Sequence, residues 1–280
     1  MTTVNEKNSI TTKNANVNFE LVSGRKNIIR KESNIFKSAG RVQIGSQQSI
    51  LPRLDNLPLL DRSLIDYNKY HKYVGHAGRK NFMAIQATRG CPYKCFYCDI
   101  YKTTVIHYRR SVKNIMDEVK MIADLGIRRI EFIDDIFNVN AKHCYSFFES
   151  VIKAGLDLEF MFPTGLKGDL FTKELIDIMV KGGTRGMNLS LEHASPRLQK
   201  VMRKNLDVEK FRENIQYITE KYPFVVVGLN TMHGFPTETE EEAYETLNFI
   251  KSIKWVHFPY MFNVRVFPGT ELEHFALEQG

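Results

Sequence analysis

The sequence predicts an α/β fold in which parallel strands alternate with helices. From residue 81 onward, short runs rich in Val, Ile and Phe alternate with longer segments that have helical apolar spacing. Six strands are too few for a closed eight-stranded barrel, so a partial barrel and an open doubly wound sheet are both consistent with the pattern. In either fold the functional residues lie at the carboxyl ends of the strands. The candidate strands are Phe82–Thr88, Arg129–Asp134, Leu158–Phe162, Gly186–Glu192, Phe224–Thr231 and Val256–Val266, and the candidate helices lie near 111–125, 140–154, 172–181, 207–221 and 239–253.

The composition is that of a globular protein with a sizeable core. The chain has 280 residues, of which 43% are hydrophobic and 25% charged, which suits one large domain or one domain plus a tail. The formal net charge is +7, but the charges are scattered, so we expect a mostly solvated surface, with an RNA or DNA substrate as the less favoured alternative. The sequence has no apolar run near the ~18 residues of a membrane span, and its N-terminus lacks the apolar core of a signal peptide. We therefore expect a cytoplasmic protein that does not enter membranes.

Three segments are expected along the chain. Residues 1–50 are rich in Asn, Ser, Thr and Lys, which predicts a disordered or loosely packed N-terminal segment. Residues 51–80 contain two prolines and scattered Leu and Tyr, which indicates an extended linker that packs on the core. Residues 81–280 carry the regular alternation and form the predicted core.

A cysteine motif follows the first predicted strand directly. Residues 89–98 read RGCPYKCFYC, so Cys91, Cys95 and Cys98 have the spacing C-x3-C-x2-C. So tight a loop can wrap three thiolates around one face of a cubane cluster and leaves the fourth iron without a local protein ligand. Ferredoxin-type electron carriers instead use four cysteines per cluster. The open coordination position favours chemistry at the metal.

A structural zinc site is the alternative for the same cysteines. Structural zinc takes four ligands, usually as paired Cys or Cys with His. The available fourth ligands are His107, which lacks the usual pair spacing, and Cys144, which lies on the apolar side of a predicted helix. The spacing therefore favours an iron–sulfur cluster over zinc.

The C-x3-C-x-aromatic-C motif after the first strand of a six-unit βα pattern resembles the radical S-adenosylmethionine (SAM) superfamily, over roughly residues 50–280. The resemblance implies a partial (β/α)6 TIM-type barrel with a [4Fe-4S] cluster on Cys91, Cys95 and Cys98. It also implies that SAM chelates the fourth iron, and that a 5′-deoxyadenosyl radical abstracts hydrogen from a substrate.

The resemblance places SAM contacts at the first two strand ends. Tyr97 precedes the third cysteine, where the family has an aromatic residue near the SAM adenine. Asp134 and Asp135 end the second strand, where the family has a polar motif that receives the SAM ammonium group. The alternative for each aspartate is an N-cap of the next helix, and for Tyr97 it is packing of the loop.

Further contacts are implied at the fourth strand. The end of this strand resembles the G-x-E-S pattern of the branch that contains methylthiotransferases and cobalamin-dependent enzymes, in which the glutamate lies near the SAM ribose. Glu192 is that glutamate, and Ser190 or Leu191 replaces the usual glycine. Lys204, or its neighbour Arg203, resembles a cation that meets the SAM carboxylate in relatives, although a solvated position is the alternative.

The last two strand ends complete the pattern. The segment HGFPTET resembles the family's G-x-P-x-E-T turn, in which Gly234 permits close approach of the backbone to the cofactor. Thr237 to Glu240 also fits a capping box for the next helix. The segment RVFPGT resembles the closing P-x-P-G-T, and the backbone around Val264 is expected near the adenine.

The reaction is open at this level. Residues 54–70 resemble the linker that joins a cobalamin-binding domain to the core in one branch, but no Asp-x-His-x-x-Gly motif precedes them. We therefore expect that the cobalamin domain is missing, reduced or supplied by another chain, and that the chain is a fragment or a minimal core. The main hypothesis is a radical SAM enzyme of undetermined reaction; the alternatives are a cobalamin-dependent methyltransferase and a non-catalytic iron–sulfur or zinc scaffold. The resemblance implies a small-molecule or peptide substrate and a reductase or flavodoxin as electron donor. Other strand-end residues that could face a substrate are His193, Lys167, His233 and Tyr260.

Overall fold

The computed structural model describes residues 35–38, 41–44, 53–70, 80–100 and 106–279. The chain divides into two compact units, Met1–Arg62 and Ser63–Gly280, each of which is described by itself. In the first unit, β1 (Ile35–Ser38) and β2 (Arg41–Ile44) form an antiparallel hairpin that the sequence did not predict. The predicted segment boundaries at residues 50 and 80 stay predictions. Short 3-10 helices are η2 (Leu54–Asn56), η3 (Arg62–Leu64), η4 (Tyr67–Tyr70) and η5 (Gly168–Leu170).

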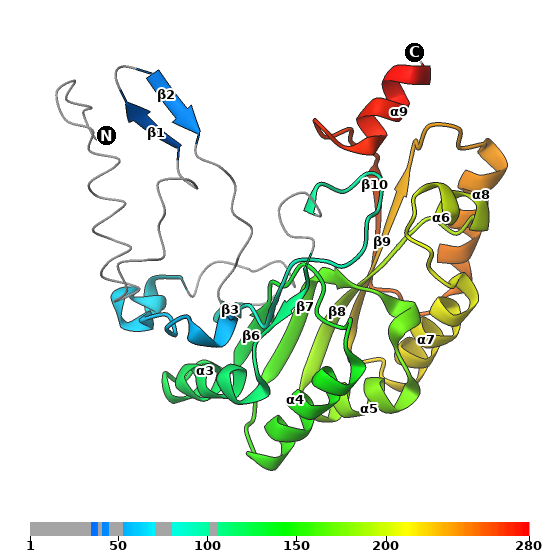
Figure 1. Ribbon diagram of the computed structural model, residues 1–280. Helices are drawn as coiled ribbons and strands as arrows, with labels where there is room; N and C mark the ends of the chain where they lie inside the picture. The colour runs from blue at the N-terminus through cyan, green and yellow to red at the C-terminus, as the bar shows by residue number, and fades with distance from the viewer. Residues whose placement is uncertain (1–34, 39–40, 45–52, 71–79, 101–105, 280) are drawn as a thin grey trace. The chain divides into compact units, whose positions relative to one another are not determined.

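A six-stranded parallel sheet dominates the described part of the second unit (Figure 1). Its strands are β3 (Phe82–Ile85), β6 (Arg129–Phe132), β7 (Glu159–Leu166), β8 (Thr184–Glu192), β9 (Val226–His233) and β10 (Phe258–Asn263). The order across the sheet is β10-β9-β8-β7-β6-β3, so each strand pairs with the strand that follows it along the chain. All six predicted strands are present, although the first ends at Ile85, and Thr88 belongs instead to a short hairpin of β4 (Thr88–Arg89) and β5 (Tyr108–Arg109).

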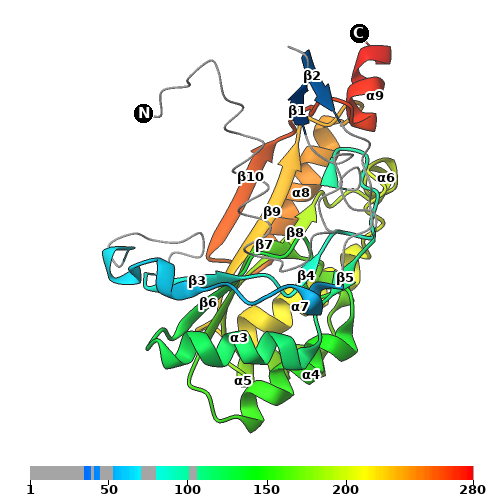
Figure 2. The ribbon, with the colours of Figure 1, turned by 60° about the vertical axis from the view of Figure 1, so that its left-hand side comes forward.

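The strand order decides between the two predicted architectures. A doubly wound sheet reverses its strand order partway and carries helices on both faces. Here the order never reverses, and right-handed crossovers place the connecting helices on the same face. The fold is therefore the partial (β/α)6 barrel that the sequence predicted. Figure 2 shows β8, β9 and β10 as neighbouring strands with α8 (Glu240–Ser252) beside them.

The helices fall within one residue of most predicted bounds because each has a clear cap. Ser111, Asn140, Thr172, Asp207 and Thr239 each accept a hydrogen bond from a backbone N–H in the first turn. The predicted helices are α3 (Val112–Asp124), α4 (Ala141–Lys153), α5 (Lys173–Lys181), α7 (Val208–Lys221) and α8 (Glu240–Ser252); two more, α6 (Pro196–Val201) and α9 (Glu271–Gln279), were not predicted. Among the described residues, no helix has the length and apolar character needed to cross a membrane.

The two faces of the sheet have different residues. Along β8, Met187, Leu189 and Leu191 belong to the core beneath the helices, whereas Asn188 and Ser190 alternate with them and lie on the opposite, inner face. The same alternation continues in β9, whereas the residues of the edge strand β10 are exposed or partly exposed on both faces. The helix-covered face therefore holds the main hydrophobic core, and the inner face is left for polar and aromatic side chains.

A cluster of phenylalanines fills the core between α4 and the first strands. Phe147 on α4 is fully buried, and its ring lies 5.4 Å from Phe132 on β6 and 5.6 Å from Phe160 on β7. Phe132 in turn stacks on Phe162 at 5.1 Å. Because large rings interlock here at near-crystalline density, loss of one leaves a cavity that its neighbours cannot fill.

We expect Phe147→Ala to lower the free energy of unfolding by about 3–5 kcal/mol, through lost burial and the residual cavity. The matched control is Tyr145→Ala on the same helix, where the side chain is 43% exposed and the expected change is within about 0.5 kcal/mol. Guanidinium denaturation measures both variants. Equal destabilisation of the two variants would contradict this account of the core.

Candidate active site

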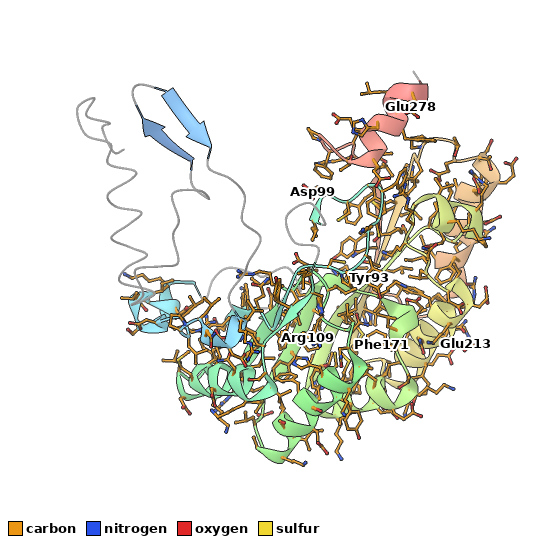
Figure 3. The ribbon with its side chains drawn as sticks, in the orientation of Figure 1. Tyr93, Asp99, Arg109, Phe171, Glu213 and Glu278 are labelled. Atoms are coloured by element: carbon orange, nitrogen blue, oxygen red, sulfur yellow. The ribbon has the colours of Figure 1, made fainter. Side chains whose placement is uncertain are left out.

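The cysteine loop begins beyond the carboxyl end of β3. Cys91, Cys95 and Cys98 lie in the connection between β4 and β5, and all three are partly exposed. Tyr93, in the same loop, lies at the end of the sheet where the strands finish (Figure 3). The structure thus places the loop at the edge of the sheet that the sequence predicted for the functional residues.

Backbone hydrogen bonds attach the loop to three separate elements. Gly90 has a φ of 86°, which favours glycine, and its N–H donates to the carboxylate of Asp135 at 2.7 Å. The N–H of Phe96 donates to the carbonyl of Met202 at 3.0 Å, just after α6. The carbonyl of Phe96 accepts from the N–H of Leu272 at 3.0 Å, at the start of α9. The loop is therefore held from β6, α6 and α9.

An aromatic cluster packs beneath the loop. Phe96 is buried and stacks on Phe235 with ring centroids 6.1 Å apart, and Phe275 of α9 lies 6.3 Å from Phe96. Tyr97 lies 5.9 Å from Phe235. Val264 packs against the same cluster and donates its N–H to the carbonyl of His233 at 2.9 Å. Tyr97 and Val264, both predicted near the adenine, are therefore brought to one apolar cluster.

Partial burial favours the protonated form of the three thiols. Burial raises the pKa of Cys91 to about 11, and it also raises the pKa values of Cys95 and Cys98. The ammonium group of Lys204 acts in the opposite direction on Cys95 and Cys98. Because a metal binds the thiolate, a bound cluster has to displace these protons, and the nearby cation favours that step.

The donor set fits a cubane cluster better than a single zinc ion. Within the described ranges, no three His, Cys, Asp or Glu side chains converge on a point that can hold one metal ion. Zinc requires such convergence, whereas each thiolate of a cubane binds a different iron, so the three sulfurs need only surround one face. The two alternative zinc ligands are occupied elsewhere: Cys144 is buried in the core, and His107 Nε2 lies 3.1 Å from the carbonyl of Ile136.

Asp134 ties the second strand to the first. Its buried carboxylate accepts hydrogen bonds from Ala87 N at 3.2 Å, from Thr88 Oγ1 at 2.6 Å and from the backbone N–H of Thr88. Burial nevertheless raises the pKa of Asp134 to about 6. This carboxylate therefore fixes the chain just before the cysteine loop.

The capping alternative for the two aspartates is wrong. Helix α4 begins after Asn140, whose side chain accepts from His143 N at 2.8 Å. Six residues separate Asp134 from the helix, so neither aspartate caps it. Asp135 instead accepts from Gly90, as described above, and so lies directly beside the first cysteine. The predicted contact of Asp134 and Asp135 with the SAM ammonium stays a prediction.

Glu192 and Lys204 form a buried ion pair next to the loop. Lys204 Nζ lies 2.7 Å from Glu192 Oε1, and both side chains are about nine-tenths buried. Glu192 has a φ of 65°, and the pairing of β8 with β9 shifts register between Ser190 and Glu192. Such a bulge redirects the side chain that follows it. Burial and the neighbouring Glu192 raise the pKa of Tyr97 well above its ordinary value, so these predicted residues do share one region.

A second buried ion pair was not recognised from the sequence. Lys167 follows β7, and its Nζ lies 2.7 Å from Asp169 Oδ2 and 5.3 Å from the centre of the Tyr93 ring. Asn138 exchanges two hydrogen bonds with the backbone of Lys167, at 2.9 and 3.1 Å. Asp169 also accepts from the N–H of Asp207 at 3.2 Å, at the start of α7. The spacing Lys-x-Asp directly after a strand was the available signal.

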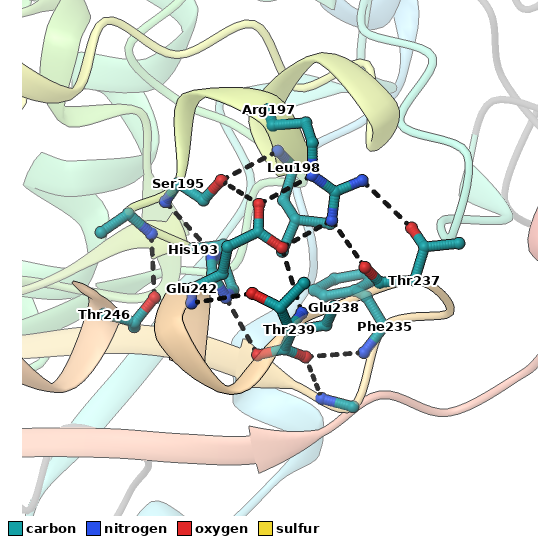
Figure 4. Close-up of polar contacts among 12 residues, drawn as sticks. His193, Ser195, Arg197, Leu198, Phe235, Thr237, Glu238, Thr239, Glu242 and Thr246 are labelled. Carbon is teal, nitrogen blue, oxygen red and sulfur yellow. Dashed lines mark hydrogen bonds and ion pairs between the residues drawn. The ribbon is translucent and has the colours of Figure 1, made fainter. Parts of the chain in front are cut away.

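The turn after β9 is held to the end of β8 by Glu238 (Figure 4). Its Oε2 accepts from the N–H groups of Gly234 and, at 2.9 Å, Phe235. Its Oε1 lies 3.0 Å from Nε2 of the fully buried His193. Since Nδ1 of His193 accepts from Ser195 N at 3.0 Å, the proton lies on Nε2 and is donated to Glu238. Gly234 has a φ of 82°, and a Cβ atom added there would meet nothing within 4 Å, so its backbone is open on that side.

The predicted capping box at Thr237 to Glu240 is wrong by two residues. Helix α8 is capped by Thr239 and Glu242, which bond each other's backbone N–H groups at 3.3 and 3.1 Å. Glu242 also accepts from Ser195 Oγ at 2.6 Å and forms an ion pair with Arg197, and the guanidinium lowers the pKa of Glu242 to about 2. These contacts from the start of α6, visible in Figure 4, favour the later capping box.

Comparison with known proteins agrees with this arrangement. The family model of the radical SAM superfamily matches residues 85–250. An uncharacterized methyltransferase of Pyrococcus horikoshii is 25% identical over 244 residues, which are 86% of this chain and 51% of that protein. The tRNA-2-methylthio-N(6)-dimethylallyladenosine synthase of Aquifex aeolicus is 27% identical over 226 residues, which cover 76% of this chain and 50% of the synthase. The chain thus spans about half the length of the curated relatives it matches.

The fold is also found in solved structures. The radical S-adenosylmethionine methyltransferase TsrM of Kitasatospora setae, with tryptophan substrate and a SAM analogue bound, superposes with a TM-score of 0.64 at 20% identity, over 77% of this chain and 41% of TsrM. A second structure of TsrM contains cobalamin and a [4Fe-4S] cluster. At this identity the likeness concerns the fold.

The pKa of Asp134 predicts a pH dependence of stability. Because its folded-state pKa of about 6 lies above the ordinary 3.8, the folded state binds the proton more tightly. Stability from this group is therefore greatest below about pH 4 and falls by about 3 kcal/mol as the pH rises through 6. Asp134→Asn, which cannot ionise, should remove that fall. Guanidinium denaturation from pH 4 to 7.5 measures the free energy of unfolding of both proteins. If the two plots of this free energy against pH are parallel, the pKa of Asp134 is not raised.

Proposed function

Because the chain belongs to the radical SAM superfamily, we propose that Cys91, Cys95 and Cys98 hold a [4Fe-4S] cluster with which the protein cleaves SAM. The observation that carries the proposal is that one loop provides three thiols at the carboxyl edge of a parallel sheet, attached by backbone bonds to three separate elements. A site with three ligands leaves one metal position for the cofactor.

The cluster and SAM are the cofactors of this superfamily, in which the reduced cluster supplies an electron to SAM and the resulting radical abstracts hydrogen from the substrate. The chain's own residues hold and orient these groups. The backbone bonds of Gly90 and Phe96 fix the loop, and Lys204 favours the thiolate form of Cys95. The aromatic cluster around Phe235 keeps water from the side of the loop that faces α9.

We assign the SAM contacts by chemistry. The carboxylate of Glu192 suits the ribose hydroxyl groups, and the ammonium of Lys204 suits the SAM carboxylate. Both groups already lie in one desolvated place beside Cys95, where they bind each other. The other residues proposed to contact SAM are Tyr97 and Val264 at the adenine, Asp134 and Asp135 at the amine, and Ser190 and Gly234 along the edge of the sheet.

For the reaction we propose transfer of a methyl or methylthio group. The relatives named above are a methyltransferase and a methylthiotransferase. A cobalamin-dependent methyl transfer is the second candidate, because a structure of TsrM contains cobalamin. In that case residues other than the described ones, or another chain, would bind the cobalamin. A small molecule or peptide remains the predicted substrate and a reductase or flavodoxin the predicted electron donor; the tRNA-modifying relative adds RNA as a further candidate substrate.

Substitution of the cysteines tests the cluster. We expect Cys91→Ala, Cys95→Ala and Cys98→Ala each to lose most iron and sulfide after anaerobic reconstitution, because two thiolates cannot hold a cubane firmly. Cys144→Ala is the matched control, since this fourth cysteine is buried in the core. Dithionite and SAM are then added, and chromatography measures 5′-deoxyadenosine and S-adenosylhomocysteine, the two products expected from radical cleavage and methyl transfer.

The result separates the alternatives. A cluster with neither product would indicate a scaffold, and a protein that contains zinc and no sulfide would overturn the proposal.

Substitution of Lys204 tests the SAM site. We expect Lys204→Met to weaken equilibrium binding of SAM to the cluster-loaded protein by roughly tenfold or more, because a desolvated charge pair with the SAM carboxylate is lost. Lys204→Arg should restore part of the affinity. Arg203→Met, which removes a pair with Glu271 in which the arginine is 54% exposed, should change it by less than about twofold. Equal losses in Lys204→Met and Arg203→Met would refute the assignment.

A further inference from the structure

The inner face of the sheet carries an uncharged polar surface built on two glycines. On β9, a Cβ atom at Gly228 would lie 2.2 Å from Asn188 Oδ1 and 3.1 Å from the Tyr260 ring. On β7, a Cβ atom at Gly165 would lie 2.4 Å from Ser190 Oγ. Only glycine at these positions lets the neighbouring side chains lie flat across the sheet. The amide oxygen of Asn188 and the ring of Tyr260 therefore flank the same point.

The orientation of the Asn188 amide is fixed. Its Nδ2 donates to the carbonyl of Pro163 at 2.8 Å, and a carbonyl can only accept, so the nitrogen and oxygen cannot be exchanged. Asn230 Nδ2 lies 3.3 Å from Ser190 Oγ. Within the described residues no donor is assigned to Oδ1 of Asn188 or of Asn230, and both residues are partly exposed. Two amide oxygens on this face are thus available to accept hydrogen bonds.

An aromatic wall borders these amides at the edge of the sheet. Phe258, Tyr260 and Phe262 project from the same side of β10, because their partners in β9 are Gly228, Asn230 and Met232. Successive rings lie 6.1 and 5.8 Å apart and are nearly parallel, at 16° and 12°. Phe258 and Phe262 are each 49% exposed, so about half of each ring lacks cover by the described residues.

The charge of this surface restricts what can bind to it. The surface consists of uncharged side chains, namely Asn188, Ser190, Asn230 and the β10 aromatics. The ionisable Glu131 lies on the same face, but it is only 1% exposed and already has interaction partners. A charged ligand would lose its hydration without gaining a counter-ion. Amide acceptors select ligands with N–H or O–H donors, and an aromatic wall selects flat rings.

The surface is continuous with the cysteine loop. Met232 ends the inner row of β9 that contains Gly228 and Asn230, and it packs against the aromatic cluster that contains Phe96 and Tyr97. A ring bound on Asn188 would therefore lie on the same inner face as the proposed cofactor site.

We propose that this surface, centred on Asn188, Asn230 and Tyr260, is the subsite for the reacting part of the substrate, and that this part is a neutral heteroaromatic ring with N–H donors. The proposal rests on the proposed function, whose substrate class it specifies. Asn188 accepts an N–H of the ring or of an amino group on the ring, Asn230 accepts a second donor, and the β10 aromatics pack against the ring. Amino-substituted nucleobases and the indole of tryptophan both have this chemistry.

Equilibrium dialysis against cluster-loaded protein saturated with SAM tests the proposal, since saturation prevents a nucleobase from binding at the cofactor site. The probes are 9-methyladenine and N-acetyltryptophanamide. Each is compared with an analogue that lacks the donor: 9-methylpurine and the 1-methylindole derivative. We expect one of the two rings to bind saturably and its analogue to bind roughly tenfold more weakly. The ring that binds distinguishes a nucleobase from an indole as source.

Three variants assign the effect to residues. Asn188→Leu should abolish the difference between ring and analogue, whereas Tyr260→Leu should weaken both alike. Gly228→Ala, which displaces the Asn188 amide, should reproduce the effect of Asn188→Leu without changing that residue. The matched controls Asn248→Leu and Tyr244→Leu, at exposed positions of α8, should leave both affinities unchanged.

Cluster content and SAM cleavage are measured on the same samples. If the wild-type protein lacks both, the proposed function fails. If both are intact, three results show that the subsite is wrong while the proposed function stands. Neither ring binds, or the analogue that lacks the donor binds equally well, or Asn188→Leu retains the difference between ring and analogue.

Discussion

The consecutive order of six parallel strands is the constraint on which the site depends. Each right-handed crossover returns the chain to the same end of the sheet, so every strand finishes at one edge. Segments far apart in sequence meet there: the cysteine loop, Asp134–Asp135, Lys167–Asp169, Glu192 with Lys204, and the turn after β9. A strand order with one reversal would have covered the inner face with helices and removed the proposed substrate surface.

Departures from regular backbone are concentrated near that edge. Glu192, Arg203, Asn205 and Thr237 have φ values of 65°, 55°, 47° and 71°, a region that side chains with a Cβ rarely adopt. The surrounding structure has to hold such residues in place. Lys204 holds the Glu192 side chain, and Arg197 bonds both the hydroxyl and the carbonyl of Thr237. The polar contacts between α6 and the α8 turn thus stabilise the shape of the edge as well as the helices.

The two faces of the sheet follow different packing rules. Beneath the helices, interlocked phenylalanines exclude water and provide stability. On the inner face, Gly165 and Gly228 leave room for Ser190 and Asn188, so polar side chains lie across the strands rather than upright. Polar side chains cannot replace the phenylalanines of the core, because a buried amide there would lack hydrogen-bond partners.

The sequence by itself determined the alternation of strands and helices, since apolar periodicity and capping residues act locally, and it located the three cysteines because their spacing is short. It placed the capping box of α8 two residues too early, because the choice of Thr239 and Glu242 depends on Glu242 meeting Ser195 and Arg197 near the start of α6. Nor could it show that Lys167 lies over the Tyr93 ring, or that Asp134 accepts hydrogen bonds from Thr88. These contacts join residues that the chain brings together only when the sheet forms, so only the tertiary structure decided them.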